Sequence, residues 1–163
     1  MMSPSPDPLS PSKRRVRQSR VARLAKSFGF LGRIEYRHVY SQSGGAQYGR
    51  GPTVEEDILT VYAEAFERDA NPDDFSLATI IAHERGHQLL ARHPRIGPRL
   101  GAGITLAAEE VLASLIGSMV CGAGHDRNLL VAKATAELLQ RGTAPEDAVR
   151  LILNLLELLG EYL

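Results

Sequence analysis

The spacing of apolar side chains divides much of the chain into strand-like and helical segments. Residues 34–40 alternate apolar and polar side chains and are rich in β-branched and aromatic types, which predicts a β-strand. Residues 77–93 instead show apolar side chains at helical spacing, and Pro94 sets the end of this predicted helix near His93. Residues 105–121 are strongly apolar and predict a buried helix. Two further helices are expected over 126–141, which Asp126 could cap, and over 143–159.

Other segments have weaker patterns. Residues 13–28 carry a thin apolar stripe among basic side chains and predict a helix that ends at Gly29. Residues 41–52 contain four glycines and are expected to form a loop. Residues 57–65 fit either a buried strand or a helix. Asn71 is the expected N-cap of the helix that runs toward residue 93, because Pro72 suits the first helical position.

Length and composition indicate one globular domain. The chain has 163 residues, of which 44% are hydrophobic and 23% charged, enough to bury a core. We expect a disordered Pro/Ser-rich tail over 1–12, a basic segment over 13–33 and a single domain over 34–163. The one cysteine excludes an intramolecular disulfide and a cysteine-rich metal centre. No apolar run approaches the ~20 residues of a membrane span, and the N-terminus lacks a secretory signal, so we expect a cytoplasmic protein without a membrane partner.

The net charge of zero conceals an uneven distribution. Residues 1–33 contain eight basic side chains and one acidic one, whereas the remaining residues contain 11 basic and 18 acidic ones. Such a basic arm can contact nucleic acid, but charge runs are usually solvated. We therefore expect a solvated helix docked on the acidic body, with nucleic-acid binding as the alternative. The leucine-rich stretch over 151–159 is expected to form core or a homodimer face.

The sequence His-Glu-Arg-Gly-His at 83–87 is the strongest chemical signal in the chain. Residues four apart on a helix differ by about 40° around the axis, so His83 and His87 project from one face and can bind one Zn²⁺. Glu84 lies about 100° from His83 around the helix axis, where it can reach a metal-bound water without being a ligand. General-base activation of water needs this arrangement. Gly86 is unfavourable inside a helix and indicates that another element packs closely there.

A zinc site of this kind needs a third protein ligand. Glu109 and Glu110 lie in the apolar helix over 105–121, where an unpaired carboxylate is costly. Glu110 shares a helix face with small side chains and is the preferred ligand, whereas Glu109 is expected to face solvent. Ser114, one turn after Glu110, is placed to hydrogen-bond a ligating imidazole.

His93 is the other candidate for the third ligand. It follows His87 by six residues, which is the spacing of the H-E-x-x-H-x-x-G-x-x-H pattern. The glycine of that pattern lets the helix end early, but Leu90 occupies its position here. A helix that continues through Leu90 turns His93 away from the metal.

The 83–87 motif followed by a Glu-bearing helix resembles the zincin metallopeptidases of the gluzincin type. Residues 109–117 are similar to the metallopeptidase domain of plasmid antirestriction proteins, and less closely to the ImmA/IrrE group. Over about residues 54–121, the resemblance implies an α+β, zincin-like fold with a small mixed sheet packed on the two site helices and additional C-terminal helices. It also implies a strand antiparallel to the substrate that grips the peptide backbone, a role for residues 57–62 or 34–40.

We therefore expect a zinc metallopeptidase that acts on a peptide or protein, with His83, His87 and Glu110 as ligands and Glu84 as general base. The alternative is a zinc-stabilised, non-catalytic regulatory or binding module whose basic arm contacts DNA or a partner protein. The hydrolytic reaction needs an additional donor for the oxyanion. The candidates for this donor are Tyr48, Tyr62, His93 and His125.

Overall fold

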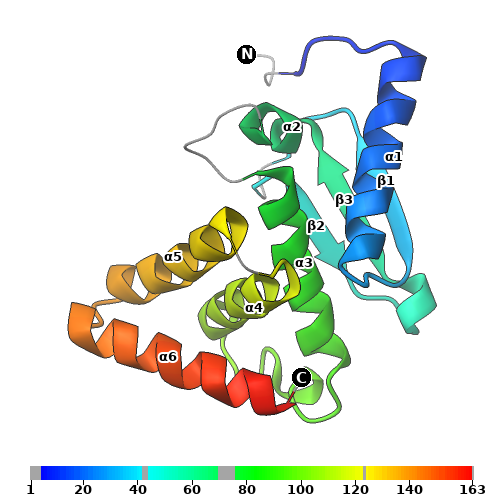
Figure 1. The fold of residues 1–163 in the computed structure, drawn as a ribbon. Coiled ribbons are helices and arrows are strands. Elements are labelled where there is room, and N and C mark those ends of the chain that lie inside the picture. The colour runs from blue at the N-terminus through cyan, green and yellow to red at the C-terminus, as the bar shows by residue number, and fades with distance from the viewer. Residues whose placement is uncertain (1–4, 42–43, 70–75, 123, 163) are drawn as a thin grey trace.

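The computed structural model describes residues 5–41, 44–69, 76–122 and 124–162 (Figure 1). Within these residues the chain forms an α+β structure of six α-helices and a three-stranded mixed sheet, which confirms the expected class. The strands are β1 (Arg33–Arg37), β2 (Ala46–Gly49) and β3 (Ile58–Tyr62). The helices are α1 (Pro11–Ser27), α2 (Ala63–Asp69), α3 (Leu77–Arg92), α4 (Leu106–Val120), α5 (His125–Gln140) and α6 (Pro145–Tyr162).

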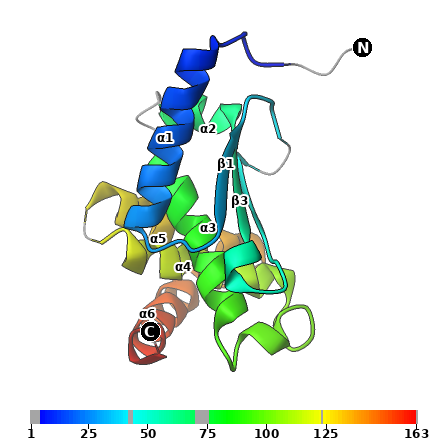
Figure 2. The same ribbon diagram turned by 90° about the vertical axis from the view of Figure 1, so that its right-hand side faces the viewer.

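The sheet has the order β1-β3-β2, with β1 parallel and β2 antiparallel to the central strand β3. Side chains alternate between the two faces of a strand, so Leu59 and Val61 of β3 point to one face. Both are fully buried, together with Val21 of α1 and Ile81 of α3. Helices α1 and α3 therefore cover the same face of the sheet, as Figure 2 shows.

Helix α3 separates two apolar clusters. The first fills the space between α1, the sheet and α3. The second lies among the C-terminal end of α3, α4, α5 and α6, and it includes Leu90, Leu115 and Ile152. Because α3 contacts protein on both sides, most of its side chains are buried, including those of His83 and Glu84. The sequence motif thus lies on the most enclosed helix of the fold.

The helix boundaries agree closely with the predicted ones where caps are visible in the sequence. Thr105 caps α4, and its hydroxyl accepts the backbone N–H of Ala108. Helix α3 ends with His93 as its C-cap, directly before Pro94. Helix α1 begins two residues before the expected start, because Ser10 caps its first turn.

Several expectations differ from the structure. Residues 41–52 were expected to be a loop but contain β2, which forms because it pairs with β3. Residues 57–65 form both of the alternatives in succession, the strand β3 and then the start of α2. The N-cap predicted at Asn71 lies outside the described residues, and α3 is capped by Ser76. Asp126 lies inside the first turn of α5, where it accepts a hydrogen bond of 2.9 Å from the Ser76 hydroxyl instead of capping the helix.

Among the described helices, none is both long enough and apolar enough to cross a lipid bilayer.

Candidate metal centre

Two glycines allow α3 and α4 to pack at unusually short distance. A Cβ atom at Gly86 of α3 would overlap the backbone carbonyl oxygen of Ala113 in α4. A Cβ atom at Gly117 of α4 would lie 2.8 Å from the carbonyl oxygen of Ala82 in α3. The close approach expected from Gly86 is therefore confirmed, and the element that packs there is α4. This contact brings the first turns of α4 against the face of α3 that carries the two histidines.

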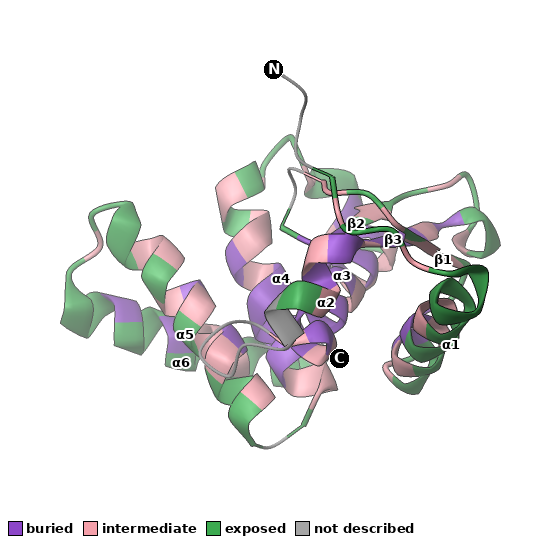
Figure 3. Ribbon diagram, turned by 90° about the horizontal axis from the view of Figure 1, so that it is seen from above, coloured by how far each residue is buried: buried purple, intermediate pink, exposed green. Residues whose placement is uncertain are grey.

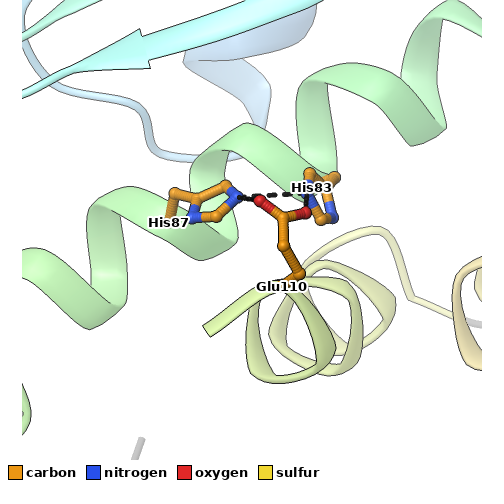
Figure 4. Close-up of side chains that lie close together, drawn as sticks. All are labelled: His83, His87 and Glu110. Atoms are coloured by element: carbon orange, nitrogen blue, oxygen red, sulfur yellow. Dashed lines mark hydrogen bonds and ion pairs between the residues drawn. The ribbon is translucent and has the colours of Figure 1, made fainter. Parts of the chain in front are cut away.

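His83, His87 and Glu110 converge at this contact (Figure 4). The Nε2 atom of His83 lies 3.0 Å from Oε2 of Glu110, and Nε2 of His87 lies 3.1 Å from Oε1 of the same carboxylate. The two Nε2 atoms are 3.1 Å apart. Zinc ligands stand ~2.0–2.1 Å from the ion, so tetrahedral ligand atoms are about 3.3 Å from each other. Each Nε2 atom lies near this spacing from the other Nε2 and from one oxygen of Glu110, so the three side chains could hold one ion.

The donor set and its exposure also fit a metal ion that reacts with a substrate. Two imidazole nitrogens and one carboxylate leave a fourth tetrahedral position open. The exposed fractions of the side chains are 7% for His83, 11% for His87 and 35% for Glu110, so the cluster opens to solvent on the Glu110 side. Burial lowers the pKa of His83 to about 4, which keeps this imidazole neutral and available as a ligand. Hydrogen bonds from His83 and His87 hold the pKa of Glu110 far below its usual range.

The outer nitrogens of both imidazoles have partners on α4. The Oγ atom of Ser114 lies 2.9 Å from Nδ1 of His83, the type of contact predicted for Ser114. Oε1 of Glu109 lies 3.3 Å from Nδ1 of His87, and the Glu109 side chain is 20% exposed. The expectation that Glu109 faces solvent is therefore wrong. Such contacts fix the ring orientation of ligating histidines, so α4 positions both rings.

Glu84 is buried on the side of α3 that faces β2. The residue is 9% exposed, and the backbone amide of Tyr48 in β2 is near enough to favour its charged form. Burial nevertheless prevails and raises the pKa of Glu84 to about 7. A carboxyl group with this pKa can both accept and release a proton near neutral pH.

The free edge of the sheet beside Glu84 belongs to β2. The carbonyl of Gly45 accepts the Tyr62 N–H of β3 at 2.8 Å, so alternation turns the peptide groups of Ala46 and Tyr48 away from β3. The sequence expectation was that residues 57–62 or 34–40 would hold the backbone of a substrate. Within the described sheet, residues 58–62 form β3, which is paired on both sides, and residues 33–37 form β1, at the edge opposite β2.

His93 lies apart from the cluster. Helix α3 continues through Leu90, and the Nδ1 atom of His93 accepts the backbone N–H groups of Arg95 and Ile96 at 3.1 and 3.2 Å. The ring thus caps the turn after α3. Among the described residues, the structure groups Glu110, rather than His93, with the two histidines.

Two of the four candidates for an oxyanion donor already donate hydrogen bonds within the fold. The Tyr48 hydroxyl donates to Asp57 at 2.8 Å, and the Tyr62 hydroxyl donates to Gln47 at 3.3 Å. His125 is the exposed first residue of α5. Lys133 of α5, which sequence reasoning did not single out, is near enough for its charge to lower the pKa of both His83 and Glu84. A lysine on a helix surface carries no sequence signal of this proximity.

A buried ionic network holds the end of α3 to the start of β3. Asp57 is fully buried, and Arg92 donates to both of its carboxylate oxygens. Gln88 and the Tyr48 hydroxyl donate to the same carboxylate at 3.0 and 2.8 Å, and the Gly51 amide donates at 2.8 Å. Burial raises the pKa of Asp57, but these hydrogen bonds outweigh it and hold the pKa well below its usual range. The network fixes the orientation of α3 relative to the sheet, and therefore the distance from Glu84 to β2.

Comparison of the chain with protein-family models, with curated proteins and with solved structures finds no match. The function is therefore inferred from the side chains of the site and their chemistry.

Proposed function

We propose that this chain is a zinc-dependent metallopeptidase with a zincin-like arrangement, in which His83, His87 and Glu110 hold the ion and Glu84 is the general base. One observation carries the proposal. Two imidazole Nε2 atoms 3.1 Å apart each lie within 3.1 Å of one oxygen of the Glu110 carboxylate, and a buried carboxyl group with a raised pKa follows the first histidine in sequence. A purely structural site has no need of a base at this position.

The ligand set suits a hydrolytic site. Bound Zn²⁺ would supply Lewis acidity, lowering the pKa of a water molecule and polarising the carbonyl of the substrate. His83 and His87 would bind through Nε2, because their Nδ1 atoms contact Ser114 and Glu109. The carboxylate of Glu110 reaches both Nε2 atoms and completes the set.

Glu84 performs the proton transfers in this proposal. Its carboxylate takes a proton from the attacking water and later delivers it to the nitrogen of the leaving amine. Burial stabilises the protonated carboxyl group, whereas the charge of His87 is the strongest influence in favour of the charged form, followed by Lys133 and the Tyr48 amide. Burial prevails, and a pKa of about 7 suits a group that must both take up and release a proton near neutral pH.

The free edge of β2 is the proposed binding surface for the substrate backbone. Outward-facing peptide groups of an edge strand can pair with an extended peptide, which gives affinity without dependence on sequence. Because the Tyr48 amide lies against Glu84, the peptide group of Ala46 and the carbonyl of Tyr48 are the groups we propose for pairing, and a peptide held there would pass beside the base. Lys133 and His125 are the side chains we propose as candidates to stabilise the oxyanion.

The test combines metal analysis with peptide cleavage. Purified full-length protein should contain about one equivalent of zinc and should cleave an unstructured protein substrate. Glu84→Gln should keep the zinc and lose cleavage, because it removes the base but no ligand. Wild-type protein that holds zinc without cleaving any unstructured substrate would favour the alternative of a zinc-stabilised binding module. Protein that holds no zinc in excess zinc salt would overturn both.

A further inference from the structure

The exposed face of α1 is strongly basic. The helix contains seven basic and no acidic side chains among its 17 residues. At 100° per residue, five of the seven fall within an arc of about 160°, where Ser12, Ser19 and Ser27 also lie. All five are exposed: Lys13, Arg15, Arg20, Arg23 and Lys26. Figure 3 shows the exposed face of α1 directed away from the sheet.

Among the described residues, four of the five basic side chains on this face have no acidic partner. Helix α1 docks through Val21 and Ala25, which are fully buried, and through hydrogen bonds of Arg17 and Gln18 to β1. In the described part of the chain, Lys13, Arg15, Arg23 and Lys26 take part in no ion pair. Helix α1 is thus docked on the body of the protein, as expected, and its described attachment combines apolar burial with hydrogen bonds to β1.

The spacing of these charges has an energetic consequence. Like charges three or four positions apart on a helix repel each other by a few tenths of a kcal/mol per pair, and Arg20, Arg23 and Lys26 form such a series. A polyanion that lies along the helix removes this repulsion. The basic arc runs from residue 13 to residue 26, which spans about 20 Å at the rise of an α-helix. Duplex DNA presents one phosphate per about 1.7 Å of axis, so several phosphates lie within reach.

The chemistry of the face favours a phosphate backbone over a lipid surface. Lysine, arginine and serine side chains are common contacts to nucleic-acid phosphates. A helix that lies in a membrane interface instead needs large apolar side chains that enter the lipid. The apolar side of α1 is used against the sheet, and Val16 is the large apolar side chain that its outer face exposes.

We propose that this face of α1 binds the sugar–phosphate backbone of nucleic acid, without reading its sequence. Helix α1 lies at the opposite end of the molecule from α5 and α6, and α3 stands between α1 and α4 (Figures 1 and 3). Nucleic acid bound to α1 therefore leaves the Glu110 side of the metal centre open. The proposal does not depend on the proposed peptidase activity.

The test is salt-dependent binding of the full-length protein to a labelled 30-base-pair DNA duplex, followed by fluorescence anisotropy. Contact with five phosphates predicts a slope of about −4.5 for log K against log salt, so affinity should fall about 500-fold between 50 and 200 mM. Arg15→Gln combined with Arg23→Gln should reduce the slope to about −2.7, and the loss over the same salt range to about 40-fold. Neither side chain has an ion pair or a hydrogen bond through its guanidinium group in the described part of the chain, so circular dichroism should be unchanged.

A charge-matched control uses Arg95→Gln with Arg99→Gln, two exposed side chains in the segment after α3. This variant should bind DNA as the wild type does. Equal weakening in both double variants would mean that net charge alone acts, and would overturn the proposal. The absence of binding at 50 mM salt would also overturn it. Binding to phosphatidylserine vesicles without binding to DNA would assign the face to a membrane instead.

Discussion

The carbonyl oxygen of Ala113 in α4 occupies the space where a side chain at Gly86 of α3 would stand. The interface between the two site helices is thus backbone against backbone at this point. A side chain at either glycine would push α4 outward and carry Glu110 away from the two histidines. The missing side chain at Gly86 is therefore a geometric condition for the cluster of His83, His87 and Glu110.

Gly86→Ala should destabilise the protein by about 1–3 kcal/mol, the usual cost of overpacking a close contact. If helix propensity alone acted, the same substitution would stabilise the protein by up to ~1 kcal/mol, because alanine is more favourable than glycine inside a helix. The matched control is Gly160→Ala, because Gly160 is helical, exposed and has no atom within 4 Å of the added Cβ. The control should stabilise slightly. Urea denaturation midpoints measure both effects, and equal shifts in the two variants would contradict the packing argument.

Substitutions at four side chains should separate ligands from supporting residues. Glu110→Ala should abolish stoichiometric zinc binding, because it removes one of three ligands. Glu109→Ala should weaken zinc about 10–100-fold, the usual effect of losing a partner that orients a ligating imidazole. Ser114→Ala should weaken zinc binding by a similar factor, because Ser114 orients the imidazole of His83. His93→Ala should leave zinc affinity unchanged, and a loss there equal to that of Glu110→Ala would reverse the ligand assignment.

Removal of the metal should lower stability. An ion that binds only the folded chain adds about 4 kcal/mol when its free concentration is a thousand times its dissociation constant. Addition of a chelator should therefore shift the urea midpoint of the wild type to lower concentration. The Glu110→Ala variant should show no further shift with chelator, which separates metal loss from other effects of the reagent.

Asp57→Asn should destabilise the protein by about 1.5–3 kcal/mol at pH 7, because the hydrogen bonds from Arg92 and Gln88 lose their charged acceptor at a buried position. The pKa of Asp57 is lower in the folded state than in the unfolded state, where it is about 3.9. Its contribution is therefore complete above about pH 5 and is lost as pH falls through and below this value. Urea midpoints from pH 7 to pH 2 should converge for the wild type and the variant. Parallel curves across the acid range would show that the Asp57 charge does not stabilise the fold.

The sequence was most informative where local signals act together. Capping residues, a helical apolar repeat and Pro94 define α3, and the spacing of His83 and His87 follows from that helix alone. Strand β2 could not be predicted, because Ala-Gln-Tyr-Gly has no strand pattern and becomes a strand only by pairing with β3.

The contact of Glu109 at the candidate site also depends on another element and could not be predicted from the sequence. A single helix places it on a different face from Glu110, and its contact with His87 depends on how α4 lies across α3. The glycines at the interface set that placement. A glycine inside a helix predicts that another element packs closely, but it does not predict the angle at which the two helices cross. The ionic network of Asp57 could not be predicted either, since its partners Gln88 and Arg92 are more than 30 positions away in the sequence.

The burial of Val21 and Ala25 under the sheet makes the basic arm inseparable from the scaffold. Deleting residues 1–33 would uncover the first apolar cluster, so single substitutions suit the study of the arm better than truncation. The outward positions of α1 can change in charge one residue at a time while Val21 and Ala25 keep this cluster covered.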